Sequence, residues 1–144
     1  MSYQSSLGQL VRPVLVSACL LGIRCRYYGR AKTHHSILNI PGIIPVPVCP
    51  EQLGGSPTPQ ASASLAGGDG RTVIMRRANV QDTFREDVTL AFLSGARYSC
   101  KVVQIIGVRY ALLKEGASPV VPIGYVWMES SRRGWGSLLP CLSV

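Results

Sequence analysis

The residues best suited to chemistry in this sequence are cysteines that directly follow apolar runs. The chain has 144 residues and five cysteines. Cys19 ends a β-branched run that starts at Val11, and Cys49 follows a second apolar run over residues 43–48. Thiolates are soft, anionic ligands, so two of them at neighbouring strand ends could hold an iron–sulfur cluster. Core packing is the other interpretation, because free cysteine is among the most buried residue types.

A third candidate, Cys25, lies in a loop between Arg24 and Arg26. Positive charge beside a thiol favours the metal-binding thiolate, so these arginines predict a lowered pKa for Cys25. Cys100 falls within a long helical pattern, where core packing is the expected role. Cys141 lies in an irregular tail that supports no assignment.

Few other side chains are placed for chemistry. Glu51 lies two positions after the second of these cysteines, where a carboxylate could move a proton for a bound substrate. A loop carboxylate in water, or in an ion pair with an arginine, is the alternative. Lys114 and Glu115, at a predicted strand end, have the same two interpretations. His34 and His35 are adjacent, point in different directions, and are expected on the surface of a short helix.

The elements that must position these residues follow from the apolar pattern. Strands are expected over 11–19, 43–48, 72–75 and 108–113, and the prolines of the second run favour an edge position. Helices are expected over 32–40, with Thr33 as N-cap, and from the capping box Thr83–Glu86 to a stop at Gly107. Residues 50–70 resemble a loop, with a turn at Gly67–Gly70.

This order of elements favours an α/β fold whose sheet has parallel strands. Ligands of such sheets usually bind beyond the carboxyl ends of the strands. Cys19, Cys49 and Lys114 stand at those ends, so we expect a site there.

The charge of the chain has two interpretations. Its net charge of +8 comes from 15 Lys and Arg against 7 Asp and Glu, and twelve of the cations are arginine. Arginine makes planar, bidentate contacts with phosphate, which would suit an anionic partner such as RNA or a nucleotide. The alternative is a basic surface that keeps the protein in solution, since the charges are scattered.

No targeting or membrane segment is expected. The first ten residues lack a positive region followed by an apolar run. Proline or arginine interrupts every apolar stretch short of the roughly 20 residues that a membrane helix needs. A cytoplasmic location is therefore expected, where thiols stay reduced and serve as ligands or nucleophiles.

Taken in order, these segments resemble the thiouracil desulfidase family of bacterial iron–sulfur enzymes, long described only as a domain of unknown function. The resemblance spans about residues 14 to 119. The matching segments are Val14-Leu-Val-Ser-Ala-Cys-Leu-Leu-Gly22, Cys25-Arg-Tyr27, Ile44-Pro-Val-Pro-Val-Cys-Pro-Glu-Gln-Leu-Gly-Gly55, Pro57-Thr-Pro59, Gly67-Gly-Asp-Gly70, Glu86-Asp-Val-Thr89, Gly95-Ala-Arg97 and Ala111-Leu-Leu-Lys-Glu115.

The resemblance implies a Rossmann-like, three-layer α/β domain with a mostly parallel sheet. It also implies an oxygen-sensitive 4Fe-4S cluster held by three cysteines, with the fourth iron open. That iron takes up the sulfur of a thiolated nucleobase such as thiouracil, free or derived from RNA, and water completes its conversion to the oxo-base with release of sulfide. This is Lewis-acid chemistry without net redox change.

Carried over position by position, Cys19 and Cys49 match two of the cluster ligands. Glu51 matches the acid of the Cys-Pro-Glu segment and is a candidate proton carrier, and Ser118 is a candidate for positioning substrate or water. The third ligand should come from a Ser-Pro-Ser-Cys-Gly segment. Val121 stands at that cysteine position, so the nearest replacement is Cys25, ahead of Cys100 and Cys141.

The resemblance stops at Pro119, which divides the chain into a desulfidase-like domain, 1–119, and an atypical tail, 120–144. We hypothesise that the tail is out-of-frame translation, because the family pattern and the periodicity end together. Three functions therefore compete. One is a cluster-dependent desulfidase, and the main alternative is a non-catalytic domain that binds a nucleobase or nucleotide without a complete cluster site. The third is an unrelated redox or metal-storage role for the cysteines.

Overall fold

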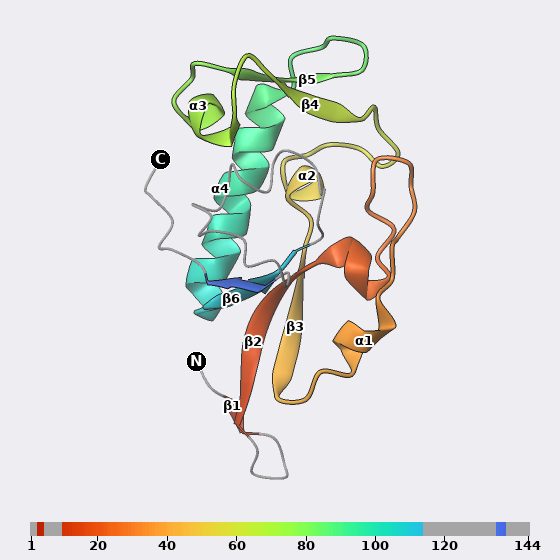
Figure 1. Ribbon diagram of the computed structural model, residues 1–144, viewed down its shortest axis with the longest axis vertical. Coiled ribbons are helices and arrows are strands. Elements are labelled where there is room, and N and C mark those ends of the chain that lie inside the picture. The colour runs from red at the N-terminus through yellow and green to blue at the C-terminus, as the bar shows by residue number, and fades with distance from the viewer. Residues whose placement is uncertain (1–2, 5–9, 114–134, 138–144) are drawn as a thin grey trace.

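The computed structural model describes residues 3–4, 10–113 and 135–137 (Figure 1). The elements are β1 (Tyr3–Gln4), β2 (Leu10–Ser17), the 3-10 helix η1 (Ala18–Leu21), α1 (His35–Leu38), β3 (Ile43–Val48), α2 (Pro50–Leu53), β4 (Ala63–Ala66), α3 (Gly70–Ile74), β5 (Asn79–Asp82), α4 (Thr89–Ile106), β6 (Tyr110–Leu112) and β7 (Trp135–Ser137).

Strand β2 is the centre of the main sheet. It pairs in parallel with β3 along one edge and with β6 along the other. The short strands β1 and β7 add antiparallel pairs, β1 to β2 and β7 to β6. The predicted α/β class with a mostly parallel sheet is therefore confirmed.

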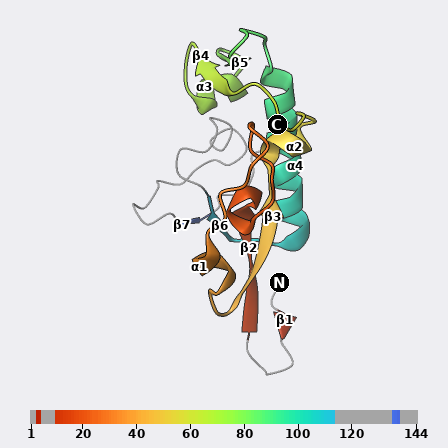
Figure 2. The ribbon, with the colours of Figure 1, turned by 90° about the vertical axis from the view of Figure 1, so that its right-hand side faces the viewer.

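Both faces of β2 are covered, because its apolar residues alternate between two cores. Leu15 packs with Val48 and with Val103 of α4. Val14 and Val16, on the opposite face, pack with Ile37 of α1. Figure 2 shows α4 and α1 on opposite sides of the strands. A continuous apolar run is what a parallel strand buried on both faces requires.

Among the described strands, β3 pairs with β2 alone and so lies at an edge of the sheet, as its prolines predict. Pro45 and Pro47 pair with Val14 and Val16 of β2, and β2 is the strand that β3 pairs with. Proline has no N–H to donate, and two prolines spaced by two residues place both missing donors on the same side of the strand. That side is the free edge, so the ladder with β2 stays complete.

Helix α4 is the long helix that the sequence predicts, but it begins later. The predicted capping box at Thr83–Glu86 is wrong, because the Asp82 carboxylate accepts hydrogen bonds from the N–H groups of Phe84 and Glu86, at 2.8 and 2.9 Å, and closes a turn there. The helix starts at Thr89, whose N–H donates to Asp87 Oδ1 at 2.9 Å.

The end of α4 matches the prediction. Gly107 adopts φ +73° after the last turn, the left-handed conformation that glycine tolerates best. In the described part of the chain, no helix combines the length and the apolar character that crossing a membrane requires.

Three other local predictions need correction. Residues 72–75 are not a strand, because the Asp69 side chain and Thr72 form a reciprocal capping box that starts α3. The first helix is limited to His35–Leu38, with His34 rather than Thr33 at its N-cap. Residues 50–70 hold α2 and β4 as well as loop, and β4 pairs antiparallel with β5.

Helix α2, which directly follows Cys49, is held against α4 by a backbone contact between two glycines. A Cβ atom on Gly95 would lie 1.9 Å from the carbonyl oxygen of Pro50, and one on Gly54 would lie 2.0 Å from that of Ala91. No side chain fits at either position. The position of Cys49 therefore depends on this close approach of two helices.

Gly95→Ala should destabilise the fold by about 1–3 kcal/mol through overpacking. The sign of the change in unfolding free energy is informative, because in an unobstructed helix alanine is more stable than glycine by about 1 kcal/mol. Urea unfolding of both proteins measures the difference. Ser94→Ala, at the neighbouring position, is the matched control and should leave stability unchanged or slightly higher. An equally stable Gly95→Ala protein would contradict the contact.

Candidate functional site

The parallel pairing of β2 and β3 brings the first two cysteines together. In the register of these strands, Ser17 is the partner of Val48. Cys49 follows β3 directly, and Cys19 lies two residues beyond β2 in η1. Parallel strands end at the same edge, so both thiols lie beyond the carboxyl ends, as the sequence predicts.

The loop over residues 22–34 folds back against η1 and carries Cys25 with it. Its backbone hydrogen bonds run from Ile23 N to Ala18 O at 3.2 Å, from Lys32 N to Cys19 O at 2.9 Å and from His34 N to Leu20 O at 2.9 Å. Both ends of the loop are thus fixed to the helix that holds Cys19. Cys25 lies inside and is 4 % exposed.

Cys19, Cys25 and Cys49 meet in what we call the three-cysteine site. Cys49 Sγ donates to the carbonyl oxygen of Cys25 at 3.8 Å, and the thiols of Cys19 and Cys49 lie close enough to that of Cys25 to shift its pKa. Cys19 and Cys25 share one buried cluster, and the half-buried Cys49 packs against it. These three are the reduced cysteines of the residues that the structure describes.

The contacts among the thiols control their acidity. The pKa of Cys25 is raised well above its ordinary value, because its thiol is held in hydrogen bonds by Cys19 and Cys49 and is buried beside them. The pKa of Cys49 is lowered by the hydrogen bond with Cys25, against an opposing effect of burial. A hydrogen bond to the charged form lowers a pKa, and one that holds the protonated donor raises it.

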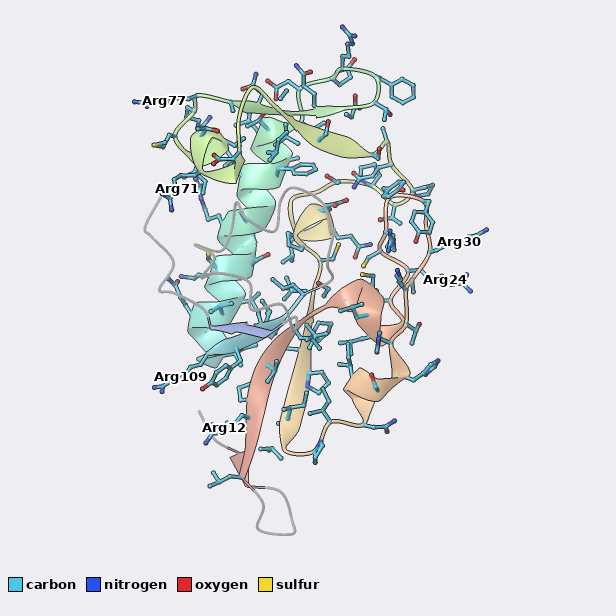
Figure 3. All side chains as sticks on the ribbon, viewed as in Figure 1. Arg12, Arg24, Arg30, Arg71, Arg77 and Arg109 are labelled. Carbon is cyan, nitrogen blue, oxygen red and sulfur yellow. The ribbon has the colours of Figure 1, made fainter. Side chains whose placement is uncertain are left out.

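The flanking arginines do not lower the pKa of Cys25, contrary to the prediction. Arg24 is exposed and extends outward from the loop (Figure 3). The Arg26 guanidinium stacks over the ring of Tyr28, 4.6 Å from its centroid. Both cations are directed elsewhere, so the neighbouring thiols dominate.

Glu51 lies in the first turn of α2, two residues after Cys49, and is half-buried. Its Oε2 accepts a hydrogen bond from the side-chain amide of Gln60. The backbone N–H of Gln60 donates to the carbonyl oxygen of Tyr27 at 2.7 Å. Gln60 therefore links the carboxylate to the loop of Cys25. No sequence pattern singled out Gln60, because this link exists only between segments distant in sequence.

The remaining candidates lie outside this arrangement. His34 and His35 are exposed, as expected, and His34 Nδ1 is 2.7 Å from Ser36 Oγ. Cys100 is half-buried on α4. Five residues singled out from the sequence fall outside the described residues, namely Lys114, Glu115, Ser118, Val121 and Cys141.

The donors of the three-cysteine site fit an iron–sulfur cluster by their chemistry. Cysteine thiolates are the usual ligands of such clusters, and each binds a different iron. Over residues 3–4, 10–113 and 135–137, no group of three His, Cys, Asp or Glu side chains is arranged to hold a metal ion. Ligands of a four-iron cluster need not converge on one ion, so three reduced thiols gathered at one place fit this group.

The fold and the site define an α/β domain with thiols and a carboxylate beyond its parallel strands, and comparison with known proteins specifies the family. The chain belongs to the 2-thiouracil desulfurase family, whose model matches residues 14–138. The family expected from the sequence motifs is thereby confirmed. The matched range runs past Pro119, and the division of the chain there stays a prediction.

Two relatives illustrate the similarity. The chain is 35% identical over 118 residues to the uncharacterized protein YbbK of Bacillus subtilis (strain 168). The match covers 79% of this chain and 76% of that protein. It is also similar to the solved structure of the 4Fe-4S-dependent thiouracil desulfidase TudS. The TM-score is 0.61 at 32% identity, and the match covers 90% of this chain and 80% of that one.

The acidities predict an order of alkylation in reduced, metal-free protein. Cys49 should react first with iodoacetamide, because it is the most exposed of the three thiols and its pKa is lowered. Its rate should level off at a lower pH than that of a cysteine in a short peptide, since the thiolate forms earlier. Peptide mapping by mass spectrometry identifies the labelled residue. Labelling of Cys25 before Cys49 would show that the lowered pKa belongs to Cys25 and not to Cys49.

Proposed function

We propose that this protein removes sulfur from a thiolated nucleobase such as thiouracil, in a reaction that depends on a 4Fe-4S cluster and releases sulfide and the oxo-base. One observation carries the proposal: reduced thiols and a carboxylate meet beyond the parallel strands of a chain in the 2-thiouracil desulfurase family. The similarity to TudS, described as 4Fe-4S-dependent, supports the choice of cluster.

Cys19 and Cys49 would hold the cluster. Both follow strands whose pairing fixes the separation of their backbones, and both are reduced thiols. When bound, the cluster supplies Lewis-acid polarisation of the carbon–sulfur bond. Cluster ligation needs these thiols in the reduced form, which a reducing compartment maintains, and we propose the cytoplasm.

Glu51 would handle the protons of the reaction. The sulfur of the base is exchanged for the oxygen of water, and the two protons of that water leave with the sulfide or pass to the surroundings. A carboxylate beside the reacting atoms can accept and return such a proton. Gln60 holds Glu51 in a single orientation through its hydrogen bond. Ser118, outside the described residues, is proposed to position the substrate or the water.

A second candidate function is a non-catalytic domain that binds a nucleobase or nucleotide. The loop over the three-cysteine site carries Arg24, Arg26, Arg30 and Lys32 without an acidic residue between them. Arg24 and Arg30 extend outward on the same side of the molecule (Figure 3). Cations beside exposed tyrosines suit the phosphates and bases of a nucleotide or RNA, with or without a cluster.

Iron content separates the two functions. After anaerobic reconstitution with iron and sulfide, the protein should be brown and hold about four irons per chain. It should also release sulfide from thiouracil. Cys19→Ala or Cys49→Ala should abolish cluster retention, as measured by iron and sulfide analysis.

Two outcomes would redirect these assignments. A protein that stays colourless after reconstitution would favour the binding domain. Full iron content in Cys19→Ala or in Cys49→Ala would refute that residue as a ligand.

Glu51→Gln tests the proton carrier separately from the cluster. The variant should keep the iron content and KM of the wild-type protein, because the amide has nearly the same shape as the carboxyl group. Its kcat should fall by about 10²-fold or more, the usual effect of losing a general acid–base. Sulfide release at saturating thiouracil measures this. Unchanged kcat would remove Glu51 from the mechanism.

A further inference from the structure

We propose that Cys25 is a third protein ligand of the cluster in this chain, so that the three-cysteine site is itself the complete set of protein thiolates. The inference rests on the proposed cluster function and adds a residue to it. The structure supports it through the burial of Cys25, its contacts and its backbone anchoring.

The burial pattern of the loop does not suit simple core packing. Ile23 is 43 % exposed, whereas Cys25, two residues later, is 4 % exposed. Burying the isoleucine instead would remove more apolar surface from water, and the gain grows with that area. The loop turns its larger apolar side chain outward and its thiol inward. The thiol of Cys25 is thereby placed in the same buried cluster as Cys19.

Cys25 lies with both of the other cysteines. It shares one buried cluster with Cys19, Cys49 packs against that cluster, and the carbonyl oxygen of Cys25 accepts from Cys49 Sγ at 3.8 Å. Since these are the reduced cysteines of the described residues, each thiol available there is in this one group. A cluster bound by Cys19 and Cys49 would lie within reach of Cys25.

The backbone holds Cys25 in place without a cluster. Its N–H donates to the carbonyl oxygen of Ile23 at 2.9 Å, and Lys32 N donates to Cys19 O at 2.9 Å. The second of these bonds ties the far end of the loop to the residue that carries the first thiol. Ligands fixed by their own backbone lose little entropy when a metal binds, which favours a preformed site.

The competing role for Cys25 is a hydrogen-bond donor to the thiolates of Cys19 and Cys49. The two roles differ in what happens to iron when the sulfur is removed. Loss of a ligand lowers the iron content, whereas loss of a donor leaves the cluster in place and changes its reduction potential.

The test compares wild-type protein with Cys25→Val, Cys25→Ser and Ile23→Ala after anaerobic reconstitution. Valine keeps the volume of the side chain but cannot ligate, serine offers a weaker oxygen ligand, and Ile23→Ala shortens an exposed side chain of the same loop. Iron and sulfide per chain and the EPR spectrum of the reduced protein are measured. Circular dichroism melts before reconstitution confirm that each variant is folded.

We expect Cys25→Val to hold about half of the wild-type iron or less, and Ile23→Ala to match the wild-type protein. Cys25→Ser should hold less iron than the wild-type protein, or a cluster with an altered EPR spectrum. If Cys25→Val does not fold, the iron content and EPR spectrum of Cys25→Ser test whether Cys25 is a ligand. Wild-type iron content in a folded Cys25→Val, even with a shifted potential, overturns the ligand assignment alone. A wild-type protein that takes up no iron overturns the proposed function itself.

Discussion

The register between β2 and β3 is the constraint on which the site depends. Because Ser17 pairs with Val48, the chain leaves both strands at the same level, and Cys19 and Cys49 start from adjacent backbone positions. A shift by one residue would turn every side chain of β2 to the opposite face. Leu15 would then lose its place against Val103, and Val16 its place beside Ile37. The packing of the core therefore also sets the spacing of these two cysteines.

A second constraint acts on the segment beyond the end of β3. Helix α2 begins directly after Cys49 and carries Glu51, and it is held by the glycine contact with α4. The contact is between backbones, so it has little freedom to adjust. The carboxylate and the thiol consequently form one rigid unit, and Gln60 connects that unit to the loop over Cys25. Catalytic groups gain from such rigid placement because little reorganisation is left for the reaction.

The parts of the fold that could be predicted from sequence are those where one local signal dominates. The apolar run of β2, the prolines of β3 and the stop of α4 at Gly107 are of this kind. Prediction failed where a side chain outside the local pattern competed for the same N–H groups. Asp82 closes a turn where the capping-box pattern at Thr83 predicts a helix. Asp69 starts a helix where an apolar stretch predicts a strand.

By itself, the sequence determined the class of fold, the family and the two cysteines that follow strands, because strand ends and turn residues are local properties. It also placed Glu51 near Cys49. Only the tertiary structure decided that Cys25 joins these thiols and that its pKa rises. The sequence shows two arginines beside Cys25, but a pKa depends on the nearest groups in space. In the folded chain those groups are the sulfurs of Cys19 and Cys49, brought there by a strand pairing and a folded-back loop that no local pattern encodes.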